Sequence, residues 1–270
     1  MASIDWPKLN EIENDKLAAA LRQAHNGVHW LARFANSYVE TNGSGDPTQL
    51  VWNASDGVIQ TKPFLDEYAV ELRVGPLELQ FREQGRPVPH AVNFEERTPA
   101  HIEAWALVEL LHRGIDRERF SKMLPYQAAD VMTGDHEEHE ADAYKTELAA
   151  IEKCLRLGTE VLLQLRQRDE GSEAAGKPLT CWPQKFQIGY EMPLPPGSGA
   201  ESLKVGISPG DAEHSQPYFF VSTPHQAQTA SHGRESVLPL SEIAERGLDR
   251  EAVVAELHQR VATLKSRLAG

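Results

Sequence analysis

The feature that most limits the fold is a pair of neighbouring segments, residues 68–74 and 77–82, in which apolar and polar side chains alternate. The apolar members are Tyr68, Val70, Leu72 and Val74 in the first segment and Leu77, Leu79 and Phe81 in the second. A period of two is typical of a strand with one buried face. Gly75-Pro76 separates the segments and is a turn signal. The pattern therefore predicts two antiparallel strands of a sheet buried on one side.

The rest of the chain mixes helical and strand-like patterns. Apolar residues recur at three- and four-residue steps over 11–39, which predicts a helix with one apolar stripe. An Asp-Gly pair predicts a hairpin between 50–53 and 58–63. Further strands are expected at 88–94, 183–192, 202–208 and 217–222, and further helices at 98–114, at 137–168 and from Asp249 onward.

These elements predict an α+β protein in which antiparallel sheet packs against long helices. Residues 1–170 are expected to form a region of helix, antiparallel sheet and helices. Residues 171–270 are expected to add the C-terminal strands and the terminal helix, packed on the first part as one compact unit. Polar residues 169–177 are typical of a linker, and 225–233 of a mobile loop.

Composition limits the kinds of partner. The chain has 270 residues and a formal net charge of -13, which disfavours a nucleic acid or an anionic membrane as partner. No apolar run approaches the ~20 residues that span a bilayer, and no export signal is visible in the first residues, so none is expected. Cys154 and Cys181 are too few for a disulfide framework. We therefore expect a cytoplasmic protein that binds a small molecule, and a homo-oligomer remains open.

Residues Gly206-Ile207-Ser208-Pro209-Gly210 match the G-x-S-x-G pattern of serine hydrolases. That reaction needs the backbone N–H of the residue after the serine, and Pro209 has none. Ser208 is therefore not expected to be a nucleophile. Pro209-Gly210 favours a type II turn instead, with positive φ at Gly210.

His136 and His139 lie in the run of the chain that is densest in possible metal ligands. Three positions apart, they would share a face if a helix had begun there. No third ligand has a recognisable spacing, so an exposed acidic helix start is favoured and no metal or cofactor is expected. Glu109-x-x-His112 is half of a di-iron motif, but the predicted strands argue against the required helix bundle.

Residues 179–223 combine aromatic side chains, turn residues and polar groups. We expect a ligand site where the strand of Trp182, the turn at Asp211 and His214, and Tyr218 meet, with His29 of the first helix above it. His25 and Trp30 are candidates for the same roof. The alternative is that Asp211 only hydrogen-bonds its own turn and that the aromatic rings are core.

The same stretch resembles an uncharacterised bacterial family with a Trp-Pro…Ser-Pro-Gly-Asp…Pro-Tyr signature. The matching residues are Trp182-Pro183, Phe186, Gly206, Ser208-Pro209-Gly210-Asp211 and Pro217-Tyr218. The family's Trp-Pro motif is usually followed by two histidines, Phe and Asp, whereas this chain has Gln184, Lys185 and Gln187 at the polar positions. If those histidines bind a metal, this chain lacks that part of the site. The family has no known activity, so the resemblance implies a fold and a cleft but no reaction.

Three hypotheses follow for function. The leading one is a small-ligand-binding protein of unknown reaction, with its cleft at the C-terminal sheet. The second is an interaction or oligomerisation module without a small ligand, which an exposed apolar patch would favour. The third is a metal-dependent hydrolase that uses His136 and His139.

Overall fold

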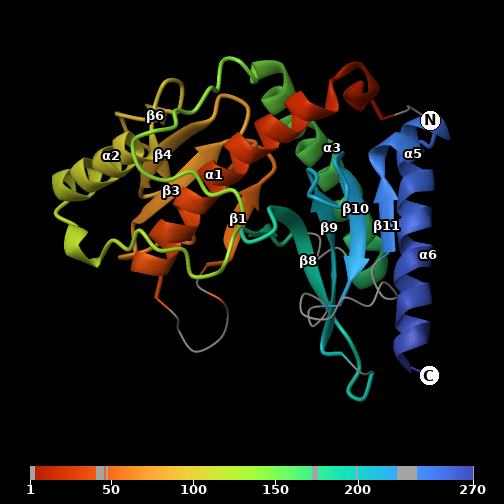
Figure 1. Cartoon of the computed structure of the whole chain (residues 1–270). Coiled ribbons are helices and arrows are strands. Elements are labelled where there is room, and N and C mark those ends of the chain that lie inside the picture. Colours follow the sequence, from red (N-terminus) through yellow and green to blue (C-terminus); the bar gives the residue numbers. More distant parts are fainter. Residues whose placement is uncertain are drawn as a thin grey trace. The chain divides into compact units, whose positions relative to one another are not determined.

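The computed structural model describes residues 4–40, 46, 48–171, 176–198, 200–223 and 236–269, and it confirms the α+β class (Figure 1). The helices are η1 Leu9–Glu11, α1 Asn14–Tyr38, α2 Pro99–His112, η2 Arg117–Arg119, α3 Lys145–Glu170, α5 Leu240–Glu245 and α6 Arg250–Ala269. The strands are β1 Leu50–Asn53, β2 Val58–Gln60, β3 Tyr68–Arg73, β4 Glu78–Glu83, β5 Arg86–Pro87, β6 Val92–Asn93, β7 Leu179–Trp182, β8 Gln187–Pro193, β9 Ser202–Ser208, β10 Tyr218–Ser222 and β11 Ser236–Pro239. Within these ranges, none of the helices combines the length and the apolar character that crossing a bilayer requires.

Contacts divide the chain into two compact units. The first comprises residues 1–11, 153–179 and 187–270, and the second comprises 12–152 and 180–186. The chain thus passes between the units before α1, inside α3, and at both ends of the segment Thr180–Phe186. The expected division at residue 170 stays a prediction, because compactness alone does not show which segments fold independently.

The sheet of the second unit has the strand order β7-β1-β2-β3-β4-β5, and β6 also pairs with β4. The predicted hairpins are confirmed: β1 pairs with β2, and β3 pairs with β4, both antiparallel. One row across four strands joins Trp52, Ile59, Leu72 and Leu79. All four side chains are buried, so this row belongs to the apolar face that the alternating pattern predicts.

Helices α1 and α2 contact the apolar face at Phe81. The Phe34 ring of α1 meets the Phe81 ring edge-on at a centroid distance of 5.4 Å, and the Trp105 ring of α2 lies 5.7 Å from it. The predicted start of α2 is confirmed, since Thr98 caps the helix by accepting the backbone N–H of His101. The predicted stripe of α1 is also confirmed, because the helix spans Asn14–Tyr38 and buries its apolar side.

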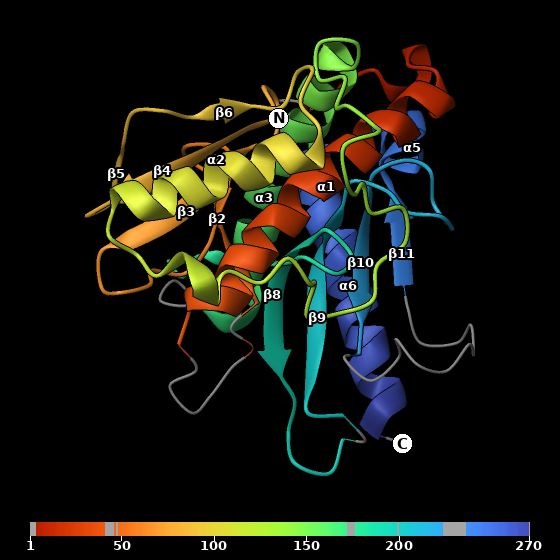
Figure 2. The ribbon, with the colours of Figure 1, turned by 60° about the vertical axis from the view of Figure 1, so that its left-hand side comes forward.

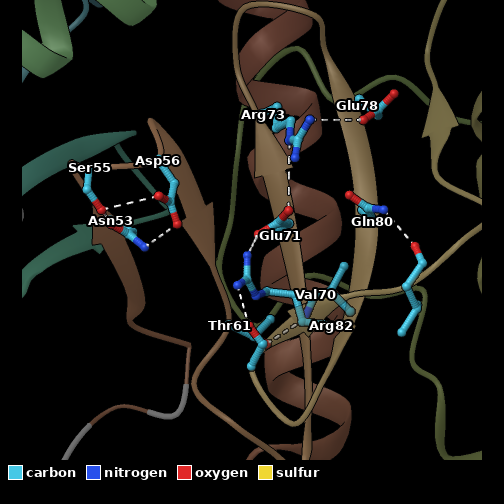
Figure 3. A network of polar contacts seen from close by, with 12 residues as sticks. Asn53, Ser55, Asp56, Thr61, Val70, Glu71, Arg73, Glu78, Gln80 and Arg82 are labelled. Atoms are coloured by element: carbon cyan, nitrogen blue, oxygen red, sulfur yellow. Dashed lines mark hydrogen bonds and ion pairs between the residues drawn. The ribbon is translucent and has the colours of Figure 1, made fainter.

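The opposite face of this sheet carries a polar network around Glu71 (Figure 3). The alternating pattern predicts Glu71 on the solvent side, yet its side chain is fully buried. Arg82 on β4 lies 2.5 Å from Glu71 Oε2, and Arg73 lies 3.8 Å from Oε1 (Figure 3). The two arginines therefore cover the carboxylate and supply the opposite charge that a buried acid requires.

Two predicted boundaries in the second unit are wrong. The strand expected at 88–94 is replaced by β5 and β6, because Pro87 and Pro89 have no N–H for a continuous ladder. The long helix begins at Lys145 and not at residue 137. The backbone of His139 exchanges hydrogen bonds with Glu96 and Arg97, which holds that segment extended.

The sheet of the first unit has the order β8-β9-β10-β11, with antiparallel pairing throughout. The strand expected at 183–192 is wrong as a single element, because residues 183–186 form a turn between β7 and β8. Phe186 has a φ of 48°, which takes the backbone out of the extended region. The strand β11 and the short helix α5 were not predicted.

The C-terminal helix confirms its predicted start, since Asp249 Oδ1 accepts the N–H of Ala252. Helix α3 extends to Glu170, two residues beyond the predicted end. Residues 172–175 of the predicted linker and all of the predicted loop at 225–233 lie outside the described residues.

Candidate functional site

Polar side chains form a stripe along α1, opposite the apolar stripe that packs on the sheet. Its members are four positions apart and therefore share one helix face: His25, His29, Arg33 and Ser37. His29 is 1% exposed and Arg33 is 7% exposed. Buried groups of this kind need hydrogen-bond partners, and these come from another segment of the same unit.

That segment comprises residues 120–139 and is here called the strap, since it has almost no regular secondary structure. It is the yellow-green segment beside α1 in Figures 1 and 2. It runs antiparallel to α1 through a ladder of contacts: Ser37 with Ser121, Arg33 with Lys122, His29 with Tyr126, Asn26 with Asp130 and Met132, Gln23 with His139, and Arg22 with Glu137. Most of these bonds use a backbone group of the strap.

The His25 and His29 rings lie against each other, with centroids 4.2 Å apart and planes tilted by 37°. Burial lowers the pKa of both imidazoles, that of His29 to about 2, so both rings are neutral at pH 7. His25 Nε2 lies 2.8 Å from the carbonyl oxygen of Pro183, which can only accept, so this nitrogen carries the proton. Nδ1 of His25 is then an acceptor.

The tautomer of His29 follows from Tyr126. The phenol oxygen lies 3.0 Å from His29 Nδ1. Burial raises the pKa of Tyr126, so the phenol keeps its hydrogen. Because no other acceptor meets that hydrogen among the described residues, we assign it to the bond with Nδ1. The proton of the neutral His29 ring then lies on Nε2, which makes Nε2 a donor.

Arg33 is a buried cation with little compensation. Its Nε donates to the carbonyl oxygen of Lys122 at 2.8 Å, and its guanidinium carbon lies 4.6 Å from the centroid of the Trp30 ring. Among the described residues, no carboxylate pairs with it. Burial lowers the pKa of Arg33, but a guanidinium remains charged at any physiological pH.

The Trp182–Phe186 turn forms one border of this site. Pro183 accepts the bond from His25, and the Phe186 ring lies 5.7 Å from the His25 ring. Trp182 itself is 8% exposed. Trp182 and His29 were predicted to belong to one site. The structure brings Pro183, the residue after Trp182, into contact with His25, which lies one helix turn before His29.

The other three predicted residues lie together in the first unit. Tyr218 Oη donates to Asp211 Oδ2 at 2.5 Å, and the His214 ring lies 4.7 Å from the Tyr218 ring. Asp211 Oδ1 also accepts the N–H groups of Glu213 and His214. Asp211 therefore organises its own turn, as the alternative proposed, and also anchors Tyr218. Since Trp182 and His29 belong to the other unit, a single site of all five residues stays a prediction.

The G-x-S-x-G stretch has a structural explanation. Ser208 ends β9, is fully buried and exchanges weak bonds with Gly210. Gly210 has a φ of 128°, positive as expected. Gly206 lies opposite Phe220 on β10, and a Cβ there would come within 2.7 Å of that ring. The glycine is thus required for packing, and the stretch lacks the strand-turn-helix geometry of a hydrolase.

His136 and His139 do not form the pair that a metal-dependent hydrolase would need. They precede α3, so the shared helix face is wrong. His139 is 1% exposed, and its Nδ1 lies 2.6 Å from Gln23 Oε1. Across the described part of the chain, no group of three or more His, Cys, Asp or Glu side chains is placed to hold a metal ion.

Sequence reasoning missed Arg33, Tyr126 and the whole strap. The four-residue spacing of His25, His29 and Arg33 on α1 was a usable signal, because it places two imidazoles and a guanidinium on one face of the helix. The strap has no periodic pattern of apolar residues. It contacts α1 mostly through its own backbone groups, which any sequence would supply.

Comparisons of the chain with protein-family models, curated proteins and solved structures found no match. The resemblance to the family with the Trp-Pro…Ser-Pro-Gly-Asp signature therefore stays a prediction. Function has to be argued from the arrangement of the side chains.

Proposed function

We propose that this protein binds a small ligand at the α1 face under the strap, beside His29 and Arg33. The observation that carries the proposal is a pair of donors on two side chains of this face that are almost fully buried. Arg33 has N–H groups without an acceptor among the described residues, and His29 has an Nε2 donor. A charged side chain that is largely buried without an ionic partner calls for an explanation, and a bound anion is one.

The surrounding side chains suit a ligand site. Trp30, Tyr126 and Phe186 supply aromatic walls, and the imidazoles and guanidinium supply a few directed polar groups. Small-molecule sites usually combine mostly apolar walls with a few placed polar atoms. The strap would act as the cover, since backbone contacts from an irregular segment can be broken one at a time.

The interaction-module alternative has less support. Few large apolar side chains are exposed among the described residues: Leu65, Val108, Leu111 and Met123. Only Val108 and Leu111 share a helix. Scattered exposed apolar residues are normal on a soluble protein and do not define a patch.

A thermal-shift screen with a metabolite library tests the proposal. A ligand that binds the native state at 100 times its Kd stabilises it by about 2.7 kcal/mol. The shift should be lost in His29→Gln and kept in Tyr218→Phe, a matched control whose hydrogen bond lies in the other unit. If no compound stabilises the protein, or if hits are unaffected by His29→Gln, the proposal is wrong.

A further inference from the structure

The chemical class of the ligand can be argued from the same face, so this inference rests on the proposed function. The starting point is the charge on Arg33. Other buried or half-buried arginines of this unit have a carboxylate partner: Arg82 contacts Glu71, and Arg113 contacts Glu109 at 2.7 Å. Arg33 has only the carbonyl of Lys122 and the face of Trp30. Unlike those two side chains, Arg33 has no carboxylate partner among the described residues.

His29 adds a second donor near that charge. Because Tyr126 occupies Nδ1, the Nε2–H of His29 has no acceptor among the described residues. His29 and Arg33 lie four positions apart on α1 and therefore share one helix face. A neutral imidazole beside a guanidinium can donate to an anion without adding a second buried charge.

The carboxylates that act electrostatically on Arg33 and Tyr126 do not fill this role. Glu103 influences Arg33 electrostatically, but its carboxylate lies 2.5 Å from Lys122 Nζ. Asp46 influences Tyr126, yet it accepts the backbone N–H and the hydroxyl of Thr48. Both acids therefore have their own partners.

We infer that Arg33 and His29 together bind the oxyanion of a small ligand, a carboxylate or a phosphate. A planar guanidinium presents paired N–H groups that match two oxygens of either anion. The Trp30 ring beneath Arg33 holds the fork in position, and Tyr126 sets the orientation of the His29 ring. The rest of the ligand would meet the aromatic walls.

The test is a titration of the wild-type protein with inorganic phosphate, with acetate, and with chloride at matched ionic strength. The readout is the NMR signal of the His29 imidazole nitrogens, assigned with His29→Gln. We expect saturable shifts with phosphate or acetate and none with chloride. Whichever anion binds more tightly distinguishes phosphate from carboxylate ligands.

Variants separate the roles of charge and geometry. Arg33→Gln should lower the affinity for the anion about tenfold to a hundredfold, the loss expected for a hydrogen bond with a charged partner. Arg33→Lys keeps the charge but not the fork and should give an intermediate loss. Arg113→Gln is the control, because it removes a buried arginine that already has a carboxylate partner. If Arg33→Gln fails to fold, the wild-type titration still decides the matter.

The outcomes distinguish this inference from the proposed function. If neither anion shifts His29 more than chloride does, while neutral or cationic compounds from the library do, the oxyanion inference is wrong and ligand binding stands. If no compound of any class perturbs His29, both fall. Saturable binding that Arg33→Gln leaves unchanged would also overturn the inference, because the anion would then lie elsewhere.

Discussion

The phenol oxygen of Tyr126 lies 3.0 Å from Nδ1 of His29, a residue 97 positions earlier in the chain. This single contact ties the strap to the polar face of α1 and determines the tautomer of the histidine. It also links stability to pH, because it holds a neutral imidazole in a buried place. The same bond therefore bears on folding and on the proposed ligand.

We predict that stability falls as the pH drops below about 6.5, the ordinary histidine pKa. Burial lowers the pKa of His29 to about 2 and that of His139 to about 4 in the folded state. The unfolded chain therefore binds more protons between those values and 6.5, so acid favours unfolding. Each histidine should contribute up to about 1.4 kcal/mol per pH unit.

Urea denaturation between pH 7 and pH 5 measures this slope. His139→Gln should make the slope shallower by removing one of these groups. The exposed His112→Gln, in which the imidazole projects from α2, is the control for simple loss of a histidine. An unchanged slope in His139→Gln would show that this ring does not carry the pH dependence.

Asn26 should be a principal clamp of the strap. Its side-chain amide donates to the carbonyl of Asp130 at 3.2 Å and accepts the N–H of Met132 at 2.9 Å. Asn26→Ala leaves the buried N–H of Met132 and the carbonyl of Asp130 without that partner and should cost about 2 kcal/mol. Asn93→Ala is the matched control, because Asn93 makes a similar pair of backbone bonds in an exposed place.

Hydrogen exchange reports this effect locally. The amide of Met132 should exchange faster in Asn26→Ala, and limited proteolysis should cut within the strap. If exchange at Met132 is unchanged, the strap is held mainly by its other contacts.

Gly158 and Ile207 should be coupled in stability. A Cβ on Gly158 of α3 would lie 2.3 Å from Ile207 Cδ1 on β9. Gly158→Ala alone should destabilise the first unit by about 1–3 kcal/mol, the usual range for overpacking. In an Ile207→Val background the clash is relieved, and alanine should then recover up to about 1 kcal/mol of helix propensity. A double-mutant cycle measures the coupling, and additive effects would contradict this packing.

Tyr218→Phe should destabilise the protein by about 1–3 kcal/mol, because it removes the bond of a buried phenol to the carboxylate of Asp211. Tyr144→Phe is the control, since that half-exposed phenol makes no side-chain hydrogen bond among the described residues. Denaturation midpoints decide between them. Equal effects of the two variants would mean that Asp211 serves only its own turn.

Patterns among residues close in sequence were sufficient to predict much of the fold. The alternation around Gly75-Pro76 predicted β3 and β4, and the Thr98-Pro99 pair predicted the start of α2. Errors came where distant residues compete with local preference. The acidic run before Lys145 looks like a helix start, but His139 is buried against Gln23 and Phe94 and keeps the chain extended. At Phe186 a positive φ interrupts an apolar run that reads as one strand.

The sequence by itself determined the α+β class, the hairpins and the main helices, because these depend on periodicity and turn residues a few positions apart. Only the tertiary structure decided which polar residues act together. His29 and Arg33 share one face of α1, but their partners Tyr126 and Lys122 lie about ninety residues later in the chain, and nothing in the sequence predicts those contacts. A helix face that looks like ordinary polar surface becomes a buried site once an irregular strap lies over it. Burial then sets the protonation of its histidines and leaves its arginine in need of a partner.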